Sequence, residues 1–474
     1  MNRHWILLLL SLGTLGAVSA EDLQTVYDHA LIADPTMQQA AALHMASRET
    51  RTQAILDMLP LNGTATKNWS GVAGSSTGTP ANGRYTSPLL GNLGLQVNLF
   101  SWNSWIALKA ASSSVAQGEA NYLAAQQELI ARVAQQYFSV LSAQDTLAAQ
   151  ESALQSVDRQ LEQAERRYEV GLIAITDVQI ARASRDSSAA GVIAAKRTLS
   201  SAEEQLRAIT GEKYQRLAKP GDGMPLLAPD PASVDSWVST ALSQNSNLIA
   251  SRLAADISHD TYLTAIGGHL PSINASASRS WALDGKDNPS TLPLNGVNTQ
   301  DIVWSVGVSV PLFSAGATQS RVRQSSYLWS AAKAGFERTL RQTEQQARDA
   351  YQGVISQIAQ VGAFKQAAQS NKISLQATEA GYEVGTKTAI DVLTARQLLV
   401  QAQTNYAQAK YGYLNNIVAL RQAAGNLDRA TIAQINGWLI EQAPAENSTP
   451  PALTPPLVTP PAPPADAAAT PGTP

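Results

Sequence analysis

The sequence contains no cysteine, and histidine is almost as scarce. The absence of cysteine excludes a disulfide framework, a thiolate metal site, a cysteine nucleophile and a lipid anchor attached to cysteine. Four histidines lie beyond residue 20, and none has the spacing of a metal-ligand pair: His29, His44, His259 and His269. The sequence also lacks a phosphate-binding loop, a nucleophile elbow and a dinucleotide fingerprint. We therefore expect neither enzymatic activity nor a cofactor.

Long apolar runs and a strong charge of one sign are missing as well. The net charge is −3 with both signs interspersed, which argues against a nucleic-acid partner. The apolar residues 5–18 follow Arg3 and precede the small residues Ser19 and Ala20. This pattern is typical of a secretory signal peptide and is too short for a membrane-spanning helix. We expect residues 1–20 to be removed and the mature chain to leave the cytoplasm.

Proline is absent between Pro88 and Pro220 and again between Pro311 and Pro444. Within both stretches apolar residues recur at every seventh position, which predicts coiled-coil helices. A helix over residues 103–167 would be roughly 100 Å long at 1.5 Å per residue. We therefore predict an antiparallel helical hairpin with one very long arm in each half of the chain.

Glycine and capping residues mark the predicted hairpin tips. Gly171 and Gly385 stand where the long helices should end, and we predict left-handed C-cap positions there. Thr176 and Asp177 are predicted to cap the returning helix of the first hairpin, and Thr388 that of the second.

The chain repeats itself with an offset of about 213 residues. The Tyr-Glu-Val-Gly segment 168–171 recurs at 382–385, and the Leu-Pro pair 59–60 recurs at 270–271. Because such matches keep their order, we predict a tandem duplication. Its parts are a first repeat (21–225), a second repeat (226–440) and a Pro/Ala/Thr-rich tail expected to be disordered (441–474).

Four segments alternate weakly between polar and apolar residues over the length of a transmembrane β-strand: 61–69, 92–100, 272–281 and 302–313. Four strands leave two open edges, which lipid does not tolerate. A membrane barrel would therefore need a dimer or a trimer to close it. The alternative is a soluble periplasmic coiled-coil scaffold without a pore.

Segments 167–178 and 381–393 resemble the paired tip motifs of the TolC family, and the likeness extends over nearly the whole mature chain. The resemblance implies an α+β membrane protein of the outer membrane that extends into the periplasm. A homotrimer with four strands per protomer would form a 12-stranded β-barrel, embedded in outer-membrane lipid and continuous with a long α-helical coiled-coil barrel.

The resemblance also implies a passive exit duct with an iris-like periplasmic gate. Such ducts work in efflux pumps or type I secretion systems, and they carry drugs, toxic compounds or proteins. The partners would be a periplasmic adaptor (membrane fusion) protein and an inner-membrane pump of RND, ABC or MFS type. The sequence does not separate drug efflux from protein secretion.

Site residues follow from the same resemblance. Tips that dock the adaptor would comprise Val170, Gly171, Leu172, Val384, Gly385 and Thr386. The periplasmic gate would link one hairpin to the other through Thr176, Asp177, Tyr382 and Lys387. Asp391 would supply one carboxylate per protomer to a ring at the entrance.

Two positions depart from the family pattern. Lys387 stands in place of arginine, so the gate link loses bidentate geometry. Thr394 stands in place of a second aspartate, which puts strong cation selectivity in doubt.

Overall fold

The computed structural model describes residues 20–58, 60–67, 70–71, 85–86, 89–214, 216–221, 223–282 and 302–440. The predicted tail and, apart from Ala20, the predicted signal peptide lie outside these residues. None of the helices in the described part is apolar over a stretch long enough to cross a membrane.

Each half of the chain contributes a helix pair, two long strands and a long helical hairpin, in that order. The first half contains α1 (Leu23–Ala33), α2 (Pro35–Leu56), β1 (Leu61–Lys67), β4 (Leu89–Phe100), α3 (Trp102–Glu169) and α4 (Ile175–Thr210). The second half contains α5 (Val234–Gln244), α6 (Ser246–Gly267), β6 (Ser272–Ala282), β7 (Ile302–Ser309), α7 (Ala317–Glu383) and α8 (Ala389–Ala424). The remaining elements are α9 (Arg429–Asn436) and the short strands β2 (Ser70–Gly71), β3 (Tyr85–Thr86), β5 (Lys219–Pro220) and β8 (Leu439–Ile440).

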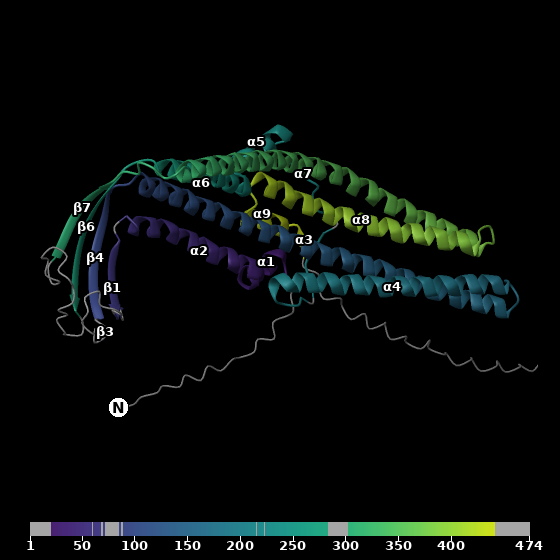
Figure 1. The fold of residues 1–474 in the computed structure, drawn as a ribbon. Coiled ribbons are helices and arrows are strands. Elements are labelled where there is room, and N and C mark those ends of the chain that lie inside the picture. The colour runs from purple at the N-terminus through teal and green to yellow at the C-terminus, as the bar shows by residue number, and fades with distance from the viewer. Residues whose placement is uncertain are drawn as a thin grey trace, which may run out of the picture.

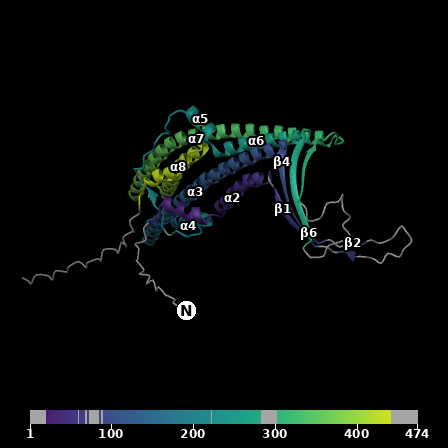
Figure 2. The ribbon, with the colours of Figure 1, turned by 90° about the vertical axis from the view of Figure 1, so that its left-hand side faces the viewer.

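The molecule is long and narrow, with the sheet at one end and both hairpin tips at the other (Figure 1). α3 and α7 contain 68 and 67 residues, so each runs along most of this length. The sheet curves away from the helix ends, and the helices lie on one side of that bend (Figure 2). The two ends of the molecule therefore differ completely in structure.

Repeat-related caps begin the second helix of each pair. The Asp34 carboxylate accepts the Met37 amide at 3.1 Å, and the Asn245 side chain accepts the Leu248 amide at 3.0 Å. A polar oxygen at this position satisfies an amide that has no partner inside the helix. The Asp34 carboxylate also accepts a hydrogen bond from Arg132 on α3 at 2.6 Å, which fixes the α1–α2 corner against the long helix.

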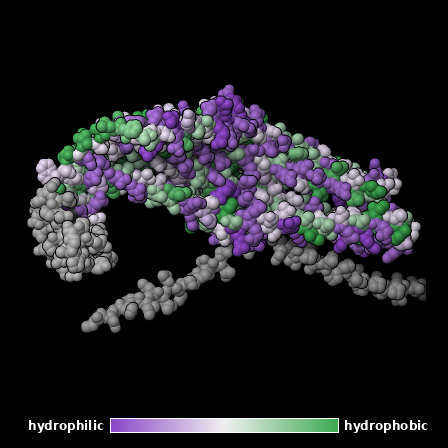
Figure 3. Space-filling model, viewed as in Figure 1, coloured by the Kyte–Doolittle hydropathy of each residue, from purple (hydrophilic) through white to green (hydrophobic). Residues whose placement is uncertain are grey.

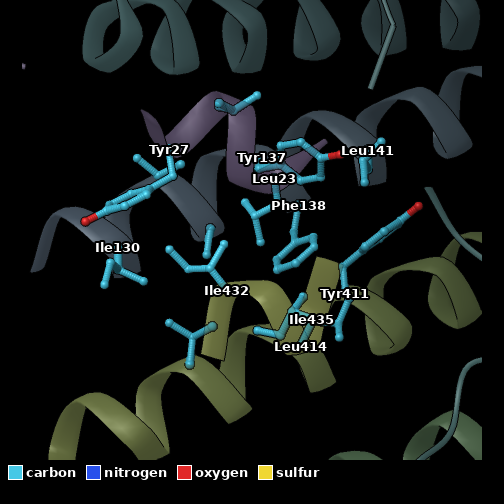
Figure 4. Packing of buried hydrophobic residues seen from close by; sticks show 14 of the residues in the cluster. Leu23, Tyr27, Ile130, Tyr137, Phe138, Leu141, Tyr411, Leu414, Ile432 and Ile435 are labelled. Carbon is cyan, nitrogen blue, oxygen red and sulfur yellow. The ribbon is translucent and has the colours of Figure 1, made fainter. Parts of the chain in front are cut away.

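The main hydrophobic core lies midway along the helices. Phe138 and Leu141 of α3, Leu414 of α8 and Ile435 of α9 have almost no exposed surface. Figure 4 shows these side chains converging from helices that are far apart in sequence. This core joins the two hairpins at their middle.

A small region of short strands and loops lies beside the helices, at the same level as the hydrophobic core. β5 pairs with β8, which brings residues 219–220 beside residues 439–440. The Lys219 ammonium lies 2.7 Å from the Asp145 carboxylate, which also accepts a hydrogen bond from the Tyr411 hydroxyl at 2.7 Å.

The four long strands form one antiparallel sheet in the order β1-β4-β6-β7. The predicted strand regions are confirmed over the described residues, with changed ends, and residues 68–69 of the first predicted strand lie outside the described part. β4 begins at Leu89, three residues earlier than predicted, and β7 ends at Ser309 instead of residue 313. Pro311 explains the early end, because proline has no amide hydrogen to donate to a neighbouring strand.

Candidate functional sites at the two ends of the molecule

One face of the sheet is lined by amide and hydroxyl side chains. Gln96 lies opposite Ser276, and Ser276 lies opposite Ser305, with the two serine hydroxyls 2.9 Å apart. The strand register gives this amide–hydroxyl face the residues Asn62, Thr64, Asn92, Gly94, Gln96, Asn98, Ser272, Asn274, Ser276, Ser278, Val303, Ser305, Gly307 and Ser309. No Asp, Glu, Lys or Arg occurs among them.

The opposite face of the same strands is apolar and exposed. Trp304, Val306 and Val308 on β7 are 77%, 61% and 65% exposed, and Leu93 and Leu95 on β4 are also exposed. Figure 3 shows hydrophobic residues gathered at this end of the molecule. A contiguous apolar patch of this kind marks contact with a membrane or another protein.

The outer strands β1 and β7 each pair on one side only among the described strands. Unpaired backbone amides and carbonyls along a strand edge are a template for another strand. The sheet is therefore an open piece with two edges of its own, a polar face and an apolar face.

Glycine shapes both hairpin tips at the other end of the molecule. Gly171 and Gly385 have φ angles of 75° and 79°, so the predicted left-handed C-cap positions are confirmed. The Leu172 amide donates to the Arg167 carbonyl at 2.9 Å, which closes the first tip. Nothing lies within 4 Å of a Cβ placed on either glycine, so the backbone angle requires glycine and crowding does not.

The other predicted tip residues are strongly exposed. Val170, Leu172 and Val384 have 70%, 71% and 75% of their surface accessible, while Thr386 donates its hydroxyl to the Gly381 carbonyl at 3.0 Å. Exposed apolar side chains on a rigid turn are suitable for contact with a partner. Docking of an adaptor at these positions stays a prediction.

The capping prediction was wrong for the first hairpin and right for the second. α4 begins after Ala174 without a side-chain cap, so Thr176 and Asp177 lie inside its first turn. α8 begins with a capping box, in which the Thr388 hydroxyl accepts the Asp391 amide at 3.2 Å.

Asp391 completes this box from the other side. Its carboxylate accepts hydrogen bonds from the Thr388 amide and hydroxyl, both at 2.9 Å. These two bonds, followed by the nearby Lys387 ammonium, hold the pKa of Asp391 below its usual value. The side chain is exposed and charged, and within one chain its oxygen is engaged at the helix end. A ring of three such carboxylates stays a prediction.

Three of the four predicted gate residues meet in one cleft between the hairpins. Asp177 from α4 and Tyr382 and Lys387 from the second tip line this cleft, whose volume is about 400 Å³. Thr176 does not line it. Among the described residues, no hydrogen bond or ion pair joins Asp177 to Tyr382 or Lys387 within the chain.

Arg167 is a cleft residue that sequence reasoning missed. Its guanidinium carbon lies 5.5 Å from the centre of the Tyr382 ring, so a cation–π contact joins the first hairpin to the second. Arg167 stands in the last turn of α3. No spacing rule signals the contact, because its partner belongs to the other repeat.

A repeat-related ion pair ties the two arms of each hairpin. Arg182 lies 3.0 Å from Glu165 in the first, and Arg396 lies 2.6 Å from Glu379 in the second, both 17 residues apart. The Arg182 side chain is 52% exposed and that of Arg396 only 11%. The Nε and Nη1 atoms of Arg396 are buried without a partner. The second hairpin thus depends more on its pair.

The described residues contain no group of three His, Asp or Glu side chains that could hold a metal ion.

The sequence model of the family described as Outer membrane efflux protein matches residues 26–212 and 237–426. The chain belongs to the outer membrane efflux protein family. The two matched blocks correspond to the two halves of the fold.

Similar proteins extend over most of the chain. Outer membrane protein TolC of Vibrio cholerae is 34% identical over 431 residues, covering 90% of this chain and 96% of that protein. Alkaline protease secretion protein AprF of Pseudomonas aeruginosa is 27% identical, covering 86% of this chain and 85% of that protein. The CmeC outer membrane channel of Campylobacter jejuni has the same fold, with a TM-score of 0.71 at 19% identity, covering 88% of this chain and 89% of that one.

Membership of the outer membrane efflux protein family places the chain in the outer membrane, extending into the periplasm. The resemblance to the TolC family is confirmed, and a soluble scaffold is not supported. The gate, the carboxylate ring and the docking tips are not tested by these similarities.

Proposed function

We propose that this protein is the outer-membrane exit duct of an efflux pump or a type I secretion system. The observation that carries the proposal is the placement of a two-faced, open-edged sheet at one end of two long helical hairpins (Figure 1). The sheet suits a lipid bilayer, and the hairpins are long enough to extend deep into the periplasm. The duct performs no chemistry, and its energy comes from a partner pump.

The duct is a homotrimer in this proposal. Each sheet has four strands and two edges, so a closed barrel needs other copies to pair with β1 and β7. The apolar face contacts lipid and the amide–hydroxyl face lines the lumen, because exposed Trp304, Val306 and Val308 are stable in hydrocarbon and unfavourable in a water-filled channel. Three copies close twelve strands and leave a wider lumen than two.

The hairpin tips form the periplasmic entrance in this proposal. The cleft lined by Asp177, Tyr382 and Lys387 brings together a carboxylate, a phenol and an ammonium that can pair across the two hairpins. Pairs at such a partly wet site are worth about 1 kcal/mol or less, so a docking adaptor can separate them. The exposed Val170, Leu172 and Val384 are the contact points for that adaptor.

The relatives indicate only in general terms which class of compound is transported. TolC of Vibrio cholerae is similar in sequence over most of the chain, and so is AprF of Pseudomonas aeruginosa, which is named for alkaline protease secretion. We propose that this chain serves an inner-membrane pump through a periplasmic adaptor, and that the pump selects what is exported.

A transport assay tests the proposal directly. The full chain is expressed in a bacterium that lacks its own exit duct but retains a pump and adaptor, and intracellular accumulation of a fluorescent dye is measured. We expect less accumulation than in cells with the empty vector. A matched variant, Val306→Asp, puts a charge on the lipid face and should fail to protect because it does not insert. The proposal is contradicted if the intact chain reaches the outer membrane but changes neither the accumulation of the dye nor the secretion of a protease.

A further inference from the structure

An apolar groove lies close to residue 440, where the described part of the chain ends. Its walls come from the loop after β5, from α5, α7 and α8, and from α9 with the segment that follows it. Its volume is about 150 Å³, and most of its lining is apolar or aromatic: Leu227, Pro229, Trp237, Leu420 and Trp438. Small-molecule sites usually measure roughly 300–1,000 Å³, so this groove is better suited to one ridge of a peptide.

Hydrogen bonds hold the groove in shape. The Tyr413 hydroxyl accepts the Leu227 amide at 2.7 Å and donates to the Leu227 carbonyl at 3.0 Å. The Trp237 indole donates to the Pro231 carbonyl at 2.9 Å. The loop and one aromatic wall are therefore fixed in advance, which lowers the conformational cost of docking a ligand there.

The groove also offers hydrogen-bond donors. The indole N–H of Trp438 donates to no other group among the described residues. Arg421 donates to the Gln434 side chain at 3.2 Å and makes no ion pair within the described part of the chain, so most of its five N–H groups can bind further acceptors. Asp230 also lines the groove and balances the charge of Arg421. These groups suit an uncharged ligand that presents carbonyl oxygens.

The sequence after residue 440 contains such a ligand. Thr-Pro-Pro occurs three times at intervals of five residues, at 449–451, 454–456 and 459–461. Proline has no amide hydrogen, and proline-rich segments favour the polyproline II helix, whose backbone carbonyls make no internal hydrogen bonds. Grooves lined by aromatic side chains recognise this helix in many proteins.

We propose that the groove binds the Thr-Pro-Pro segment, residues 449–461, of its own chain. Trp438 is itself one wall of the groove, so a loop of about ten residues is enough to bring the segment back, at little cost in chain entropy. Docking covers Leu227, half of whose surface is exposed, and fastens the region of short strands across α5 and α8.

The proposed contact lies beyond the features that define the family. The second block of residues matched by the family model ends at 426, before both Trp438 and the Thr-Pro-Pro segment. The contact does not depend on the barrel or on the entrance, because the groove and the segment belong to one chain. It is therefore tested without any measurement of transport.

Disulfide trapping tests the proposal, since the chain has no cysteine of its own. Ala228→Cys in the groove is combined with Leu453→Cys in the segment, and the full-length oligomer is oxidised in detergent. Non-reducing gels and mass spectrometry of the digested protein measure disulfides within and between chains. The matched control combines Leu453→Cys with Leu242→Cys, which is exposed on α5 outside the groove. We expect the groove pair to form an intrachain disulfide at least about tenfold faster than the control pair.

Two further variants of the trapping pair separate recognition of polyproline II from simple apolar contact. Replacing the six prolines of the segment by alanine keeps it apolar but loosens its backbone, so trapping should slow to within about twofold of the control. Trp438→Leu keeps the groove apolar and removes the indole, and it should slow trapping in the same way. If Ala228→Cys prevents assembly, Leu227→Cys provides the groove cysteine instead.

Each contrary result overturns a definite part of the proposal. Trapping no faster than in the control would show that the segment does not dock in the groove. Disulfides between chains of the oligomer would assign the groove to the tail of a neighbouring copy and overturn the intrachain contact. Fast trapping that persists in the alanine variant would overturn recognition of polyproline II. None of these results changes the expected conductance, so failure here is distinct from failure of the proposed duct.

Discussion

Arg182 and Arg396 occupy corresponding positions in the two repeats and make the same ion pair, yet their surroundings differ. Arg182 is half exposed, so water competes for its charge and the pair with Glu165 contributes little. Arg396 is buried with two unpartnered nitrogens, and among the described residues its ion pair is with the Glu379 carboxylate, which offsets its charge. The two repeats have therefore kept the same ion-pair residues, but the two pairs contribute differently to stability.

This difference predicts unequal effects of matched substitutions. Glu379→Gln should destabilise the α7–α8 hairpin by about 1–2 kcal/mol, because it leaves a buried guanidinium without a counter-charge. Glu165→Gln should cost less than about 0.5 kcal/mol in the α3–α4 hairpin. Hydrogen exchange of backbone amides near each pair measures both effects, with roughly tenfold faster exchange expected in the first case only. Equal changes in the two hairpins would refute the distinction.

The cleft residues predict a change in channel opening. Asp177→Ala combined with Tyr382→Phe removes a carboxylate and a phenol hydroxyl from the cleft, so the hairpins should separate more easily and the conductance should rise. Thr176→Ala is the matched control, since Thr176 lies next to Asp177 in sequence but outside the cleft. A correctly assembled double variant whose conductance equals that of the control would show that these groups do not hold the entrance closed.

At the scale of elements, caps and prolines determined which sequence predictions succeeded. Gly171 and Gly385 were predictable because only glycine readily adopts their positive φ angles. The Thr388 cap was predictable from its spacing to Asp391, whereas α4 starts after Ala174, which has no side-chain oxygen that could signal a cap. The end of β7 was misjudged because the alternation continues past Ser309, although Pro311 cannot pair.

Contacts between repeats lie beyond such local rules. Arg167 meets Tyr382 across more than two hundred residues of sequence, and only the folded hairpins bring them together. The buried state of Arg396 was equally hidden, because the corresponding Arg182 is exposed. Sequence periodicity predicts which face of a helix packs, but it does not state which helix packs against it.

The cap of α2 gives a pH prediction for one element. Burial raises the pKa of Asp34, but hydrogen bonds from Arg132, Thr36 and Met37 outweigh it and hold the pKa below 3.8. A lowered pKa stabilises the fold above the unfolded value of 3.8 and loses this contribution as the pH falls through the folded value. Asp34→Asn keeps a capping oxygen and removes the charge, so it should cost about 2 kcal/mol at neutral pH.

The cost of Asp34→Asn should begin to shrink as the pH falls below 3.8, because the carboxyl of the unfolded chain then takes up a proton. It should be lost once the pH is below the lower pKa of the folded chain, where the native carboxyl is neutral too. Thermal unfolding of the variant and the native chain, followed by far-UV circular dichroism at several pH values, measures the difference. The corresponding cap of the second repeat, Asn245, is already neutral. The contribution of that cap to stability should therefore not depend on pH. A constant difference at all pH values would mean that the charge of Asp34 does not contribute.

At the scale of the whole molecule, the chain is one sector of a closed structure. The open edges of β1 and β7 and the exposed apolar face are liabilities in a monomer and become pairing and lipid-contact surfaces in a ring of copies. Four strands per chain were predictable from alternation and interrupting turns. The number of copies was not, because the sequence alone is compatible with eight strands from two chains or twelve from three.

The central claim is that this chain forms a trimeric, water-filled duct through the outer membrane. The most direct test is the single-channel conductance of the detergent-extracted oligomer in a planar bilayer, with the oligomer's mass measured on the same preparation. The account predicts a trimer that conducts with a small, stable conductance. A water-soluble monomer, an inserted oligomer of another size, or an inserted trimer that does not conduct would contradict it.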